Sequence, residues 1–189
     1  MLILGIGNCL MADDGIGVHA ARRLAAAPPP GSTVTDVGTD FLSAVPFLEQ
    51  HSRVLVIDAM DAGEPPGTMY RCRADAIETP KGRSLHELGL LAMLEFVAAD
   101  RRPEIHFLGV QPARIEYSLE LSPRLAEVLP AVVKQAGKIA AELTRQPPFS
   151  AARSTPAEAS APARRPAKGG PARRSAGAPP ATSPPSARR

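Results

Sequence analysis

The sequence has few cysteines, no long apolar run and no basic segment ahead of an apolar one near its start. The two cysteines, Cys9 and Cys72, form neither a CxxC motif nor a disulfide framework, which fits a reducing compartment. A membrane helix requires roughly 20 consecutive apolar residues, and no stretch approaches that length. We therefore expect a soluble, cytoplasmic protein with no membrane partner.

Acidic and large apolar residues are almost absent from the last part of the chain. Residues 146–189 contain 10 of the 21 prolines and 8 of the 22 lysines and arginines, but only one acid, Glu158, and one large apolar residue, Phe149. Such a segment cannot bury enough apolar surface to offset the entropy lost on ordering, so we expect it to be disordered. Residues 1–145 then have the usual length of one domain.

The basic charge of the chain belongs to this tail, because residues 1–145 carry more acids than bases. A mildly acidic body has no electrostatic footprint for nucleic acid, so no specific nucleic-acid partner is expected. The arginine pairs of the tail could contact a polyanion weakly. We expect the tail to be a plain disordered extension, with a docking or nucleic-acid role as the alternative.

Strands and helices are predicted to alternate along the body. Continuous apolar runs predict buried strands, and apolar residues at helical spacing predict helices. The predicted strands are 1–6, 32–37, 53–59, 68–73 and 105–110, and the predicted helices are 14–26, 41–50, 85–98 and 122–143. This alternation predicts the α/β class: a three-layer α/β/α sandwich with a mostly parallel, twisted sheet, of the phosphorylase/hydrolase-like type.

Acidic and histidine side chains occur where these strands end or the next helix begins. Asp13 and Asp14 follow the first strand, Asp36 ends the second, Asp58 ends the third, and His86 opens the helix that starts at 85. In open α/β sheets, ligands bind at the carboxyl ends of the strands. These residues are therefore candidates for a functional site.

Each candidate also has a structural interpretation. Asp13 is placed to cap the first helix, and Asp14 would lie in its first turn, where the helix dipole favours an anion. His86 could be a surface residue near a helix start. Asp58 differs, because a carboxylate in a buried strand must find a partner or a cation. Together, Asp14, Asp58 and His86 form a ligand set that suits a divalent metal such as nickel or zinc.

Five blocks of sequence resemble, in order, those of the hydrogenase maturation endopeptidases. They are GIGNCLMADDGIGVHAARRL (5–24), DVGT (36–39), VIDAMDAGEPPGTMYR (56–71), SLHELGL (84–90), and FLGVQP (107–112) with ELSPRLAEVLP (120–130). The resemblance covers residues 1 to about 143, nearly the whole predicted domain.

This resemblance implies a metal-dependent, aspartic-type endopeptidase that removes a C-terminal extension from the nickel-loaded large-subunit precursor of a nickel-iron hydrogenase. The metal ligands of the family correspond to Asp14, Asp58 and His86, with both aspartates catalytic. We expect the nickel to be supplied by the substrate and to serve as the recognition element. Gly38 and Thr39 are expected to line the substrate cleft.

Two other functions are alternatives to an endopeptidase. A nucleotide-binding oxidoreductase is disfavoured, because Leu10 stands where the dinucleotide fingerprint needs its third glycine. A non-catalytic, metal-sensing chaperone on the same fold remains the alternative. A cysteine nucleophile is not expected, since the matched pattern uses no thiol at Cys9 and no histidine lies close to it in sequence.

Overall fold

Strands and helices alternate along the chain, and the strands pair into one five-stranded sheet. A computed structural model describes residues 1–74 and 85–146. The strands are β1 (Leu2–Ile6), β2 (Thr33–Gly38), β3 (Arg53–Ala59), β4 (Met69–Arg73) and β5 (Glu104–Val110). The helices are α1 (Ile16–Ala25), α2 (Val45–Gln50), α3 (Leu85–Met93) and α4 (Pro123–Arg145), with short 3-10 helices η1 (Ala12–Gly15), η2 (Phe41–Ala44), η5 (Leu94–Phe96) and η6 (Ala99–Arg101).

The strands are arranged in the order β2-β1-β3-β5-β4. All neighbouring pairs are parallel except β4 and β5, which are antiparallel. A parallel crossover needs a dozen or more residues, usually with a helix among them. The segment 60–68 between β3 and β4 is shorter and contains no helix, which explains why β4 is not parallel to the other strands. The predicted α/β class and mostly parallel sheet are confirmed, with one antiparallel strand at the edge.

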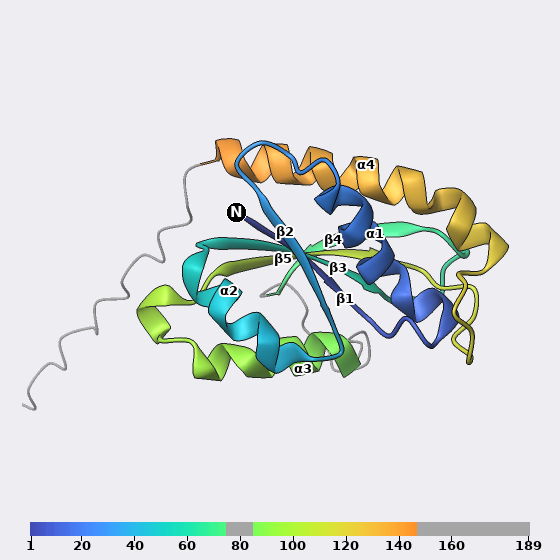
Figure 1. Ribbon diagram of the computed structural model, residues 1–189, viewed down its shortest axis with the longest axis horizontal. Coiled ribbons are helices and arrows are strands. Elements are labelled where there is room, and N and C mark those ends of the chain that lie inside the picture. Colours follow the sequence, from blue (N-terminus) through green and yellow to red (C-terminus); the bar gives the residue numbers. More distant parts are fainter. Residues whose placement is uncertain (75–84, 147–189) are drawn as a thin grey trace, which may run out of the picture. The chain divides into compact units, whose positions relative to one another are not determined.

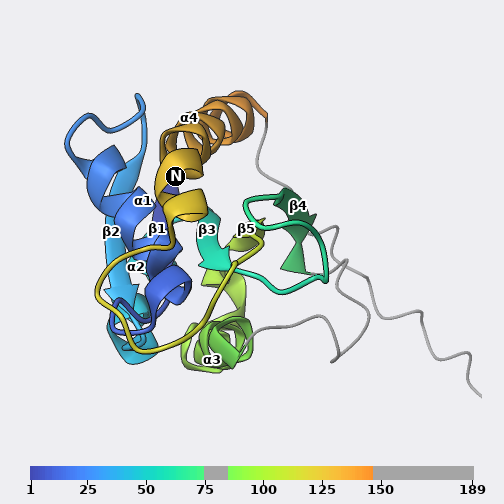
Figure 2. The same ribbon diagram turned by 90° about the vertical axis from the view of Figure 1, so that its right-hand side faces the viewer.

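Helices cover both faces of the sheet, which gives three layers (Figures 1 and 2). Alternate strand residues, such as Ile3 and Leu55, pack with α1 and α4 on one face. Their neighbours, such as Leu4 and Val54, pack with α2 and α3 on the other. Because both faces are buried, β1 and β3 have continuous rather than alternating apolar sequences. Within the described ranges, no helix combines the length and apolarity needed to cross a membrane.

Two predicted helices differ from the observed ones in their bounds. The helix predicted over 14–26 begins as the 3-10 helix η1, and α1 itself starts at Ile16. The helix predicted over 85–98 ends at Met93 and continues as the 3-10 helix η5. Val97 then adopts an extended conformation, and its side chain is buried in the core. The closing helix begins as predicted, with the Ser122 hydroxyl accepting a hydrogen bond from the Leu125 N–H at 3.3 Å.

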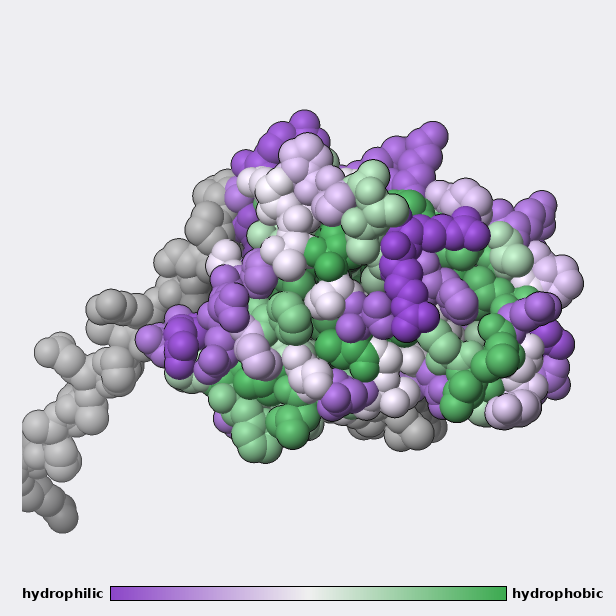
Figure 3. Space-filling view, in the orientation of Figure 1, coloured by the Kyte–Doolittle hydropathy of each residue, from purple (hydrophilic) through white to green (hydrophobic). Residues whose placement is uncertain are grey.

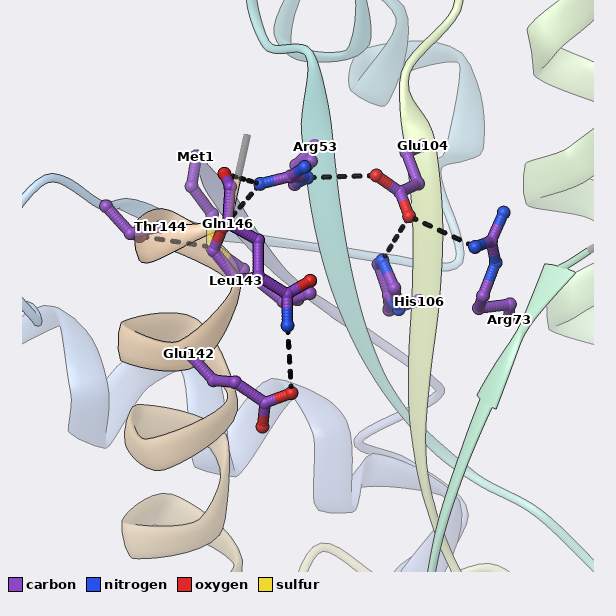
Figure 4. Close-up of polar contacts among 9 residues, drawn as sticks. All are labelled: Met1, Arg53, Arg73, Glu104, His106, Glu142, Leu143, Thr144 and Gln146. Carbon is purple, nitrogen blue, oxygen red and sulfur yellow. Dashed lines mark hydrogen bonds and ion pairs between the residues drawn. The ribbon is translucent and has the colours of Figure 1, made fainter. Parts of the chain in front are cut away.

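A buried ionic network lies at the edge of the sheet where β3 and β5 begin (Figure 4). Arg53 binds Glu104 at 2.9 Å and donates hydrogen bonds to the carbonyl oxygens of Leu143 and Gln146 at the end of α4. His106 contacts the other oxygen of Glu104 at 3.0 Å. The network thereby joins two central strands to the last turn of the closing helix. Gln146 is the one residue of the predicted tail that the structure describes, so the tail and its boundary stay predictions.

Candidate functional site

The sheet reverses its order between β1 and β3. From β1 the chain continues to β2 on one side, whereas β3 lies on the other side of β1. At such a switch point, the loops at the carboxyl ends of the strands separate and leave a place for a ligand. Asp14 follows β1 and Asp58 lies near the end of β3, so both carboxylates come to this point.

The loop after β1 turns back sharply and brings Asp14 toward β3. Gly7 has a φ of 124°, and a Cβ atom there would lie 1.9 Å from the carbonyl oxygen of Asp14. Only glycine fits this position without strain. The Asn8 N–H then donates to the Asp14 Oδ2 at 3.0 Å, and the Asn8 side chain accepts from the Leu10 N–H at 3.0 Å. Gly7 therefore allows the turn, and Asn8 holds the loop that carries Asp14.

The side chains of Asp14, Asp58 and His86 meet as the sequence predicts. The ring of His86, near the start of α3, lies between the two carboxylates. Its Nδ1 is 3.3 Å from the Asp58 Oδ1, and its Nε2 is 3.4 Å from the Asp14 Oδ2. Asp58 is fully buried and also accepts the Ala59 N–H at 2.9 Å. Phe41 flanks the imidazole, with 6.0 Å between ring centroids.

Burial is the main influence on the acidity of Asp14. It raises the pKa of the Asp14 carboxyl above its ordinary value, against the lowering effects of His86 and of the Asn8 N–H, while the charge of Asp58 raises it further. A carboxyl group with a raised pKa beside an imidazole can accept and return a proton. Asp14 and His86 keep some solvent exposure and Asp58 has none, so a substrate would reach the site from the side of Asp14 and His86.

The three side chains do not form a preassembled metal site. Among the residues the structure describes, no group of three or more His, Cys, Asp or Glu side chains has the arrangement of metal ligands. The physical reason lies in the His86 ring, whose two nitrogens face different carboxylates. The donor types suit a divalent first-row metal, but the ring or the carboxylates would have to turn before one nitrogen and both carboxylates could face the same point.

Asp36, the fourth acidic candidate, is held elsewhere. Its two carboxylate oxygens receive the Nε and Nη2 of Arg22 on α1, each at 3.3 Å. Gly38 and Thr39 lie at the carboxyl end of β2, where the Gly38 oxygen accepts the Gly7 N–H at 3.1 Å and Thr39 is exposed. They share the edge of the sheet with the site, and their role in substrate binding stays a prediction.

The prediction that Asp13 caps the first helix is wrong. No side chain caps α1 or η1, and the fully buried Asp13 carboxylate points instead to the loop after β5. It accepts the backbone N–H groups of Ala113 at 2.8 Å, Arg114 at 3.0 Å and Ser122 at 2.7 Å. Because η1 precedes the helix, Asp13 is not at the capping position. Its role is to hold loop 111–122 against the loop that carries Asp14.

Sequence reasoning missed Gln111, which organises the loop after β3. Its Oε1 accepts the Ala62 N–H at 2.8 Å and the Tyr70 hydroxyl at 3.2 Å, and its Nε2 donates to Asp61 at 2.9 Å. Gln111 is nearly fully buried. The only available signal was an amide directly after the apolar β5 segment, inside the FLGVQP block.

Cys9 lies near Asp14 but is not an activated nucleophile. Burial raises the pKa of its thiol, the charges of Asp36 and Asp14 raise it further, and only Arg22 lowers it. The thiol therefore stays protonated near neutral pH, and thiolate is the nucleophilic form. This agrees with the prediction that the site uses no thiol.

Comparison with known proteins decides the family. Residues 18–139 match the model of the family described as HycI, hydrogenase maturation protease. The chain belongs to the hydrogenase maturation protease family. Among curated relatives of this hydrogenase maturation protease is the hydrogenase expression/formation protein HupD of Rhizobium leguminosarum bv. viciae. It is 36% identical over 149 residues, which cover 74% of this chain and 73% of HupD.

Other relatives and solved structures agree with this family. HoxM of Azotobacter vinelandii is 36% identical over 172 residues, covering 86% of this protease and 81% of HoxM. The hydrogenase maturating endopeptidase HybD of Escherichia coli superposes with a TM-score of 0.65 at 26% identity, over 75% of this chain and 92% of that one. HybD of Thermococcus kodakarensis, a [NiFe] hydrogenase maturation protease, has a TM-score of 0.62 at 33% identity, over 75% and 97%.

Proposed function

We propose that this protease removes the C-terminal extension from the nickel-loaded large-subunit precursor of a nickel-iron hydrogenase, in the cytoplasm. The observation that carries the proposal is the contact of one imidazole with two carboxylates, from separate parts of the chain, at the switch point of the sheet. Family membership supports the reaction class, because the chain matches a hydrogenase maturation protease model over most of its predicted domain.

In this proposal, Asp58 and Asp14 have different tasks around His86. Asp58 is fully buried and fixed by the Ala59 N–H, so it orients the imidazole through Nδ1. Asp14 faces Nε2 from the partly exposed side and has a raised pKa. Peptide hydrolysis needs a group that takes a proton from water and one that gives a proton to the leaving amine. Asp14, His86 and Asp58 contain groups that can serve in both roles.

We further propose that nickel bound in the substrate is the recognition element. The ion would be held by oxygens of Asp14 and Asp58 and by one ring nitrogen of His86, a donor set that suits nickel. This requires the imidazole to leave at least one of its carboxylate contacts when the precursor binds. Nickel held by these residues would supply Lewis-acid chemistry, and its presence would mark the precursor as ready for cleavage.

The test uses nickel-loaded and nickel-free precursor, with the products weighed by mass spectrometry. We expect loss of a C-terminal peptide from the loaded form only. A His86→Gln variant should leave both forms intact, whereas His51→Gln, which changes a histidine bonded to Phe47 and Thr33 at the opposite edge of the sheet, should cleave like the wild type.

The possible results separate the two parts of the proposal. Cleavage of neither form by the wild-type protein would refute the protease assignment for this substrate. Equal cleavage of both forms would refute nickel recognition and retain the protease. Full activity of His86→Gln would remove the imidazole from the mechanism.

A further inference from the structure

Two neighbouring loops carry large apolar side chains that face solvent. Leu10 lies in the loop after β1 and is 51% exposed. Ile115, Tyr117 and Leu119 lie in loop 111–122 after β5 and are 52%, 80% and 66% exposed. Figure 3 shows hydrophobic (green) residues among hydrophilic (purple) ones at the surface toward the right-hand end, where these loops lie in Figure 1. We call these four residues the apolar loop surface.

Backbone hydrogen bonds join the two loops that carry the four residues. The Ser118 N–H donates to the Leu10 oxygen at 3.0 Å, and the Ala12 N–H donates to the Ser118 oxygen at 2.9 Å. Met11 and Ser118 thus form a parallel bridge, which sets the preceding residues, Leu10 and Tyr117, side by side.

Asp13 hydrogen-bonds the loop that carries three of the four residues. The buried Asp13 carboxylate binds three backbone N–H groups at the two ends of the loop that carries Ile115, Tyr117 and Leu119. The Ser118 side chain adds hydrogen bonds to the backbone of Glu120, each at 3.1 Å. A loop fixed in one conformation loses little entropy when a partner binds, which favours recognition.

These apolar residues are not explained by packing of the fold. Loops at a surface are usually polar, and a cluster of exposed apolar side chains is typical of a site where another molecule binds. Arg114 pairs with Glu116 at 2.8 Å, and the exposed Glu120 is the remaining charged residue of the loop. A partner would therefore meet apolar side chains with one ion pair and one carboxylate beside them, which suits an apolar protein segment rather than an anionic ligand.

The loop after β1 links the apolar loop surface to the candidate active site, because it carries both Leu10 and Asp14. Asp13, which holds the loop, directly precedes Asp14, and Asn8 binds both Asp14 and the Leu10 N–H. A protein bound to the surface would therefore contact the same loop that carries Asp14. We propose that Leu10, Ile115, Tyr117 and Leu119 dock an apolar segment of the protein substrate, outside the segment that is cleaved. This inference rests on the proposed function and adds to it how the precursor is selected.

The experiment compares Leu119→Ser with Phe96→Ser as a matched control. Phe96 is 65% exposed in η5, past the end of α3 that lies away from His86, so the two changes remove similarly exposed apolar groups. With nickel-loaded precursor, we expect Leu119→Ser and Tyr117→Ser to raise KM roughly tenfold and leave kcat nearly unchanged. Phe96→Ser should leave both constants as in the wild type. Circular dichroism and Tm verify that all variants are folded.

Three results would overturn the inference. Unchanged KM in both loop variants would show that the surface does not bind substrate. A fall in kcat without a rise in KM would assign the loop to catalysis rather than docking. Sedimentation showing a wild-type dimer that the loop variants dissociate would make the surface an interface between copies of the chain. If the wild-type protein cleaves no precursor at all, the proposed function itself fails, so the two failures are distinct.

Discussion

At the scale of single residues, two adjacent aspartates have separate tasks. Asp13 is turned toward loop 111–122 and accepts three backbone N–H groups, whereas Asp14 is turned toward His86. Because η1 is a tight 3-10 turn, successive side chains leave it in different directions. One aspartate therefore stabilises the loop next to the site, and the other belongs to the site.

The residue-scale prediction concerns Asp58. We expect Asp58→Asn to lower the rate of precursor processing at least about 100-fold, because the amide keeps the volume but removes the charge that orients the imidazole. The Tm should change little, since an amide oxygen can still accept the Ala59 N–H. Processing is followed by mass spectrometry, and unfolding by circular dichroism.

Asp36→Asn serves as the control for that experiment. Its carboxylate pairs with Arg22 and does not contact His86, so processing should continue at the wild-type rate. Wild-type processing by Asp58→Asn would mean that the charge of Asp58 is dispensable.

At the scale of elements, α1 packs unusually close to the sheet and so sets the position of η1 and Asp14. A Cβ atom on Gly17 would lie 2.0 Å from the carbonyl oxygen of Ile57 and 2.4 Å from that of Ile6. Both contacts are with backbone, which cannot move away as a flexible side chain can. Glycine at this position is therefore what allows the helix to lie against β1 and β3.

We predict opposite effects for two helical glycine-to-alanine changes. Gly17→Ala should lower the free energy of unfolding by about 1–3 kcal/mol or more, because it pushes α1 off the sheet. Gly137→Ala in α4 should raise it by about 0.5–1 kcal/mol, because its Cβ would have only the Pro29 side chain at 4.0 Å as a neighbour and alanine favours the helix. Urea denaturation measures both. A Gly17→Ala protein as stable as the wild type would contradict this packing.

At the scale of the whole domain, the two ends of the strands differ: one carries the candidate site and the other an ionic network that stabilises the fold. The carboxyl edge carries the candidate site, and the opposite edge carries the ionic network of Arg53, Glu104 and His106 (Figure 4). Burial raises the pKa of Glu104. Arg53 and His106 lower it through their hydrogen bonds and charges, and together they hold the pKa below its ordinary value.

This lowered pKa predicts how stability depends on pH. The folded protein keeps Glu104 ionised at pH values where the unfolded chain already binds a proton, so the contribution is full above the ordinary pKa of 4.5 and is lost as pH falls through the folded pKa. Glu104→Gln should be less stable than the wild type by roughly 1–3 kcal/mol at pH 7. The difference should shrink as the pH falls from about 5 to 3.

Glu127→Gln is the matched control for the pH experiment. Glu127 is exposed and pairs with Arg124 on the surface of α4, so its loss should change stability little at any pH. Thermal unfolding at a series of pH values gives both curves. A difference between wild type and Glu104→Gln that stays constant down to pH 3 would contradict the lowered pKa.

Much of the fold could be predicted because its signals are local. The apolar runs of β1, β3 and β5 and the helical spacing of α1 and α4 lie within short windows of sequence. The bounds of α3 were less predictable, since Val97 leaves the helix to reach a core formed by distant strands. The antiparallel direction of β4 likewise depends on its partner β5, which lies far along the chain.

The candidate site could be predicted only in part. Asp14, Asp58 and His86 were identified through sequence blocks that resemble a family, and the structure brings them together. The task of Asp13 was mistaken, because its partners Ala113 and Ser122 are about a hundred residues away and no local pattern reveals them. Gln111 was missed for the same reason, since its partners lie in the loop after β3.

The sequence by itself determined the α/β class, because periodicity is a property of the chain alone, and the resemblance of its blocks to a family indicated the three candidate residues. Only the tertiary structure decided that His86 lies between the two carboxylates and that Asp36 forms an ion pair with Arg22. It also decided that Asp13 fastens the loop bearing the apolar loop surface. The reason is that a side chain's partner depends on its direction and on residues far along the chain, which only the packed fold brings within hydrogen-bonding distance.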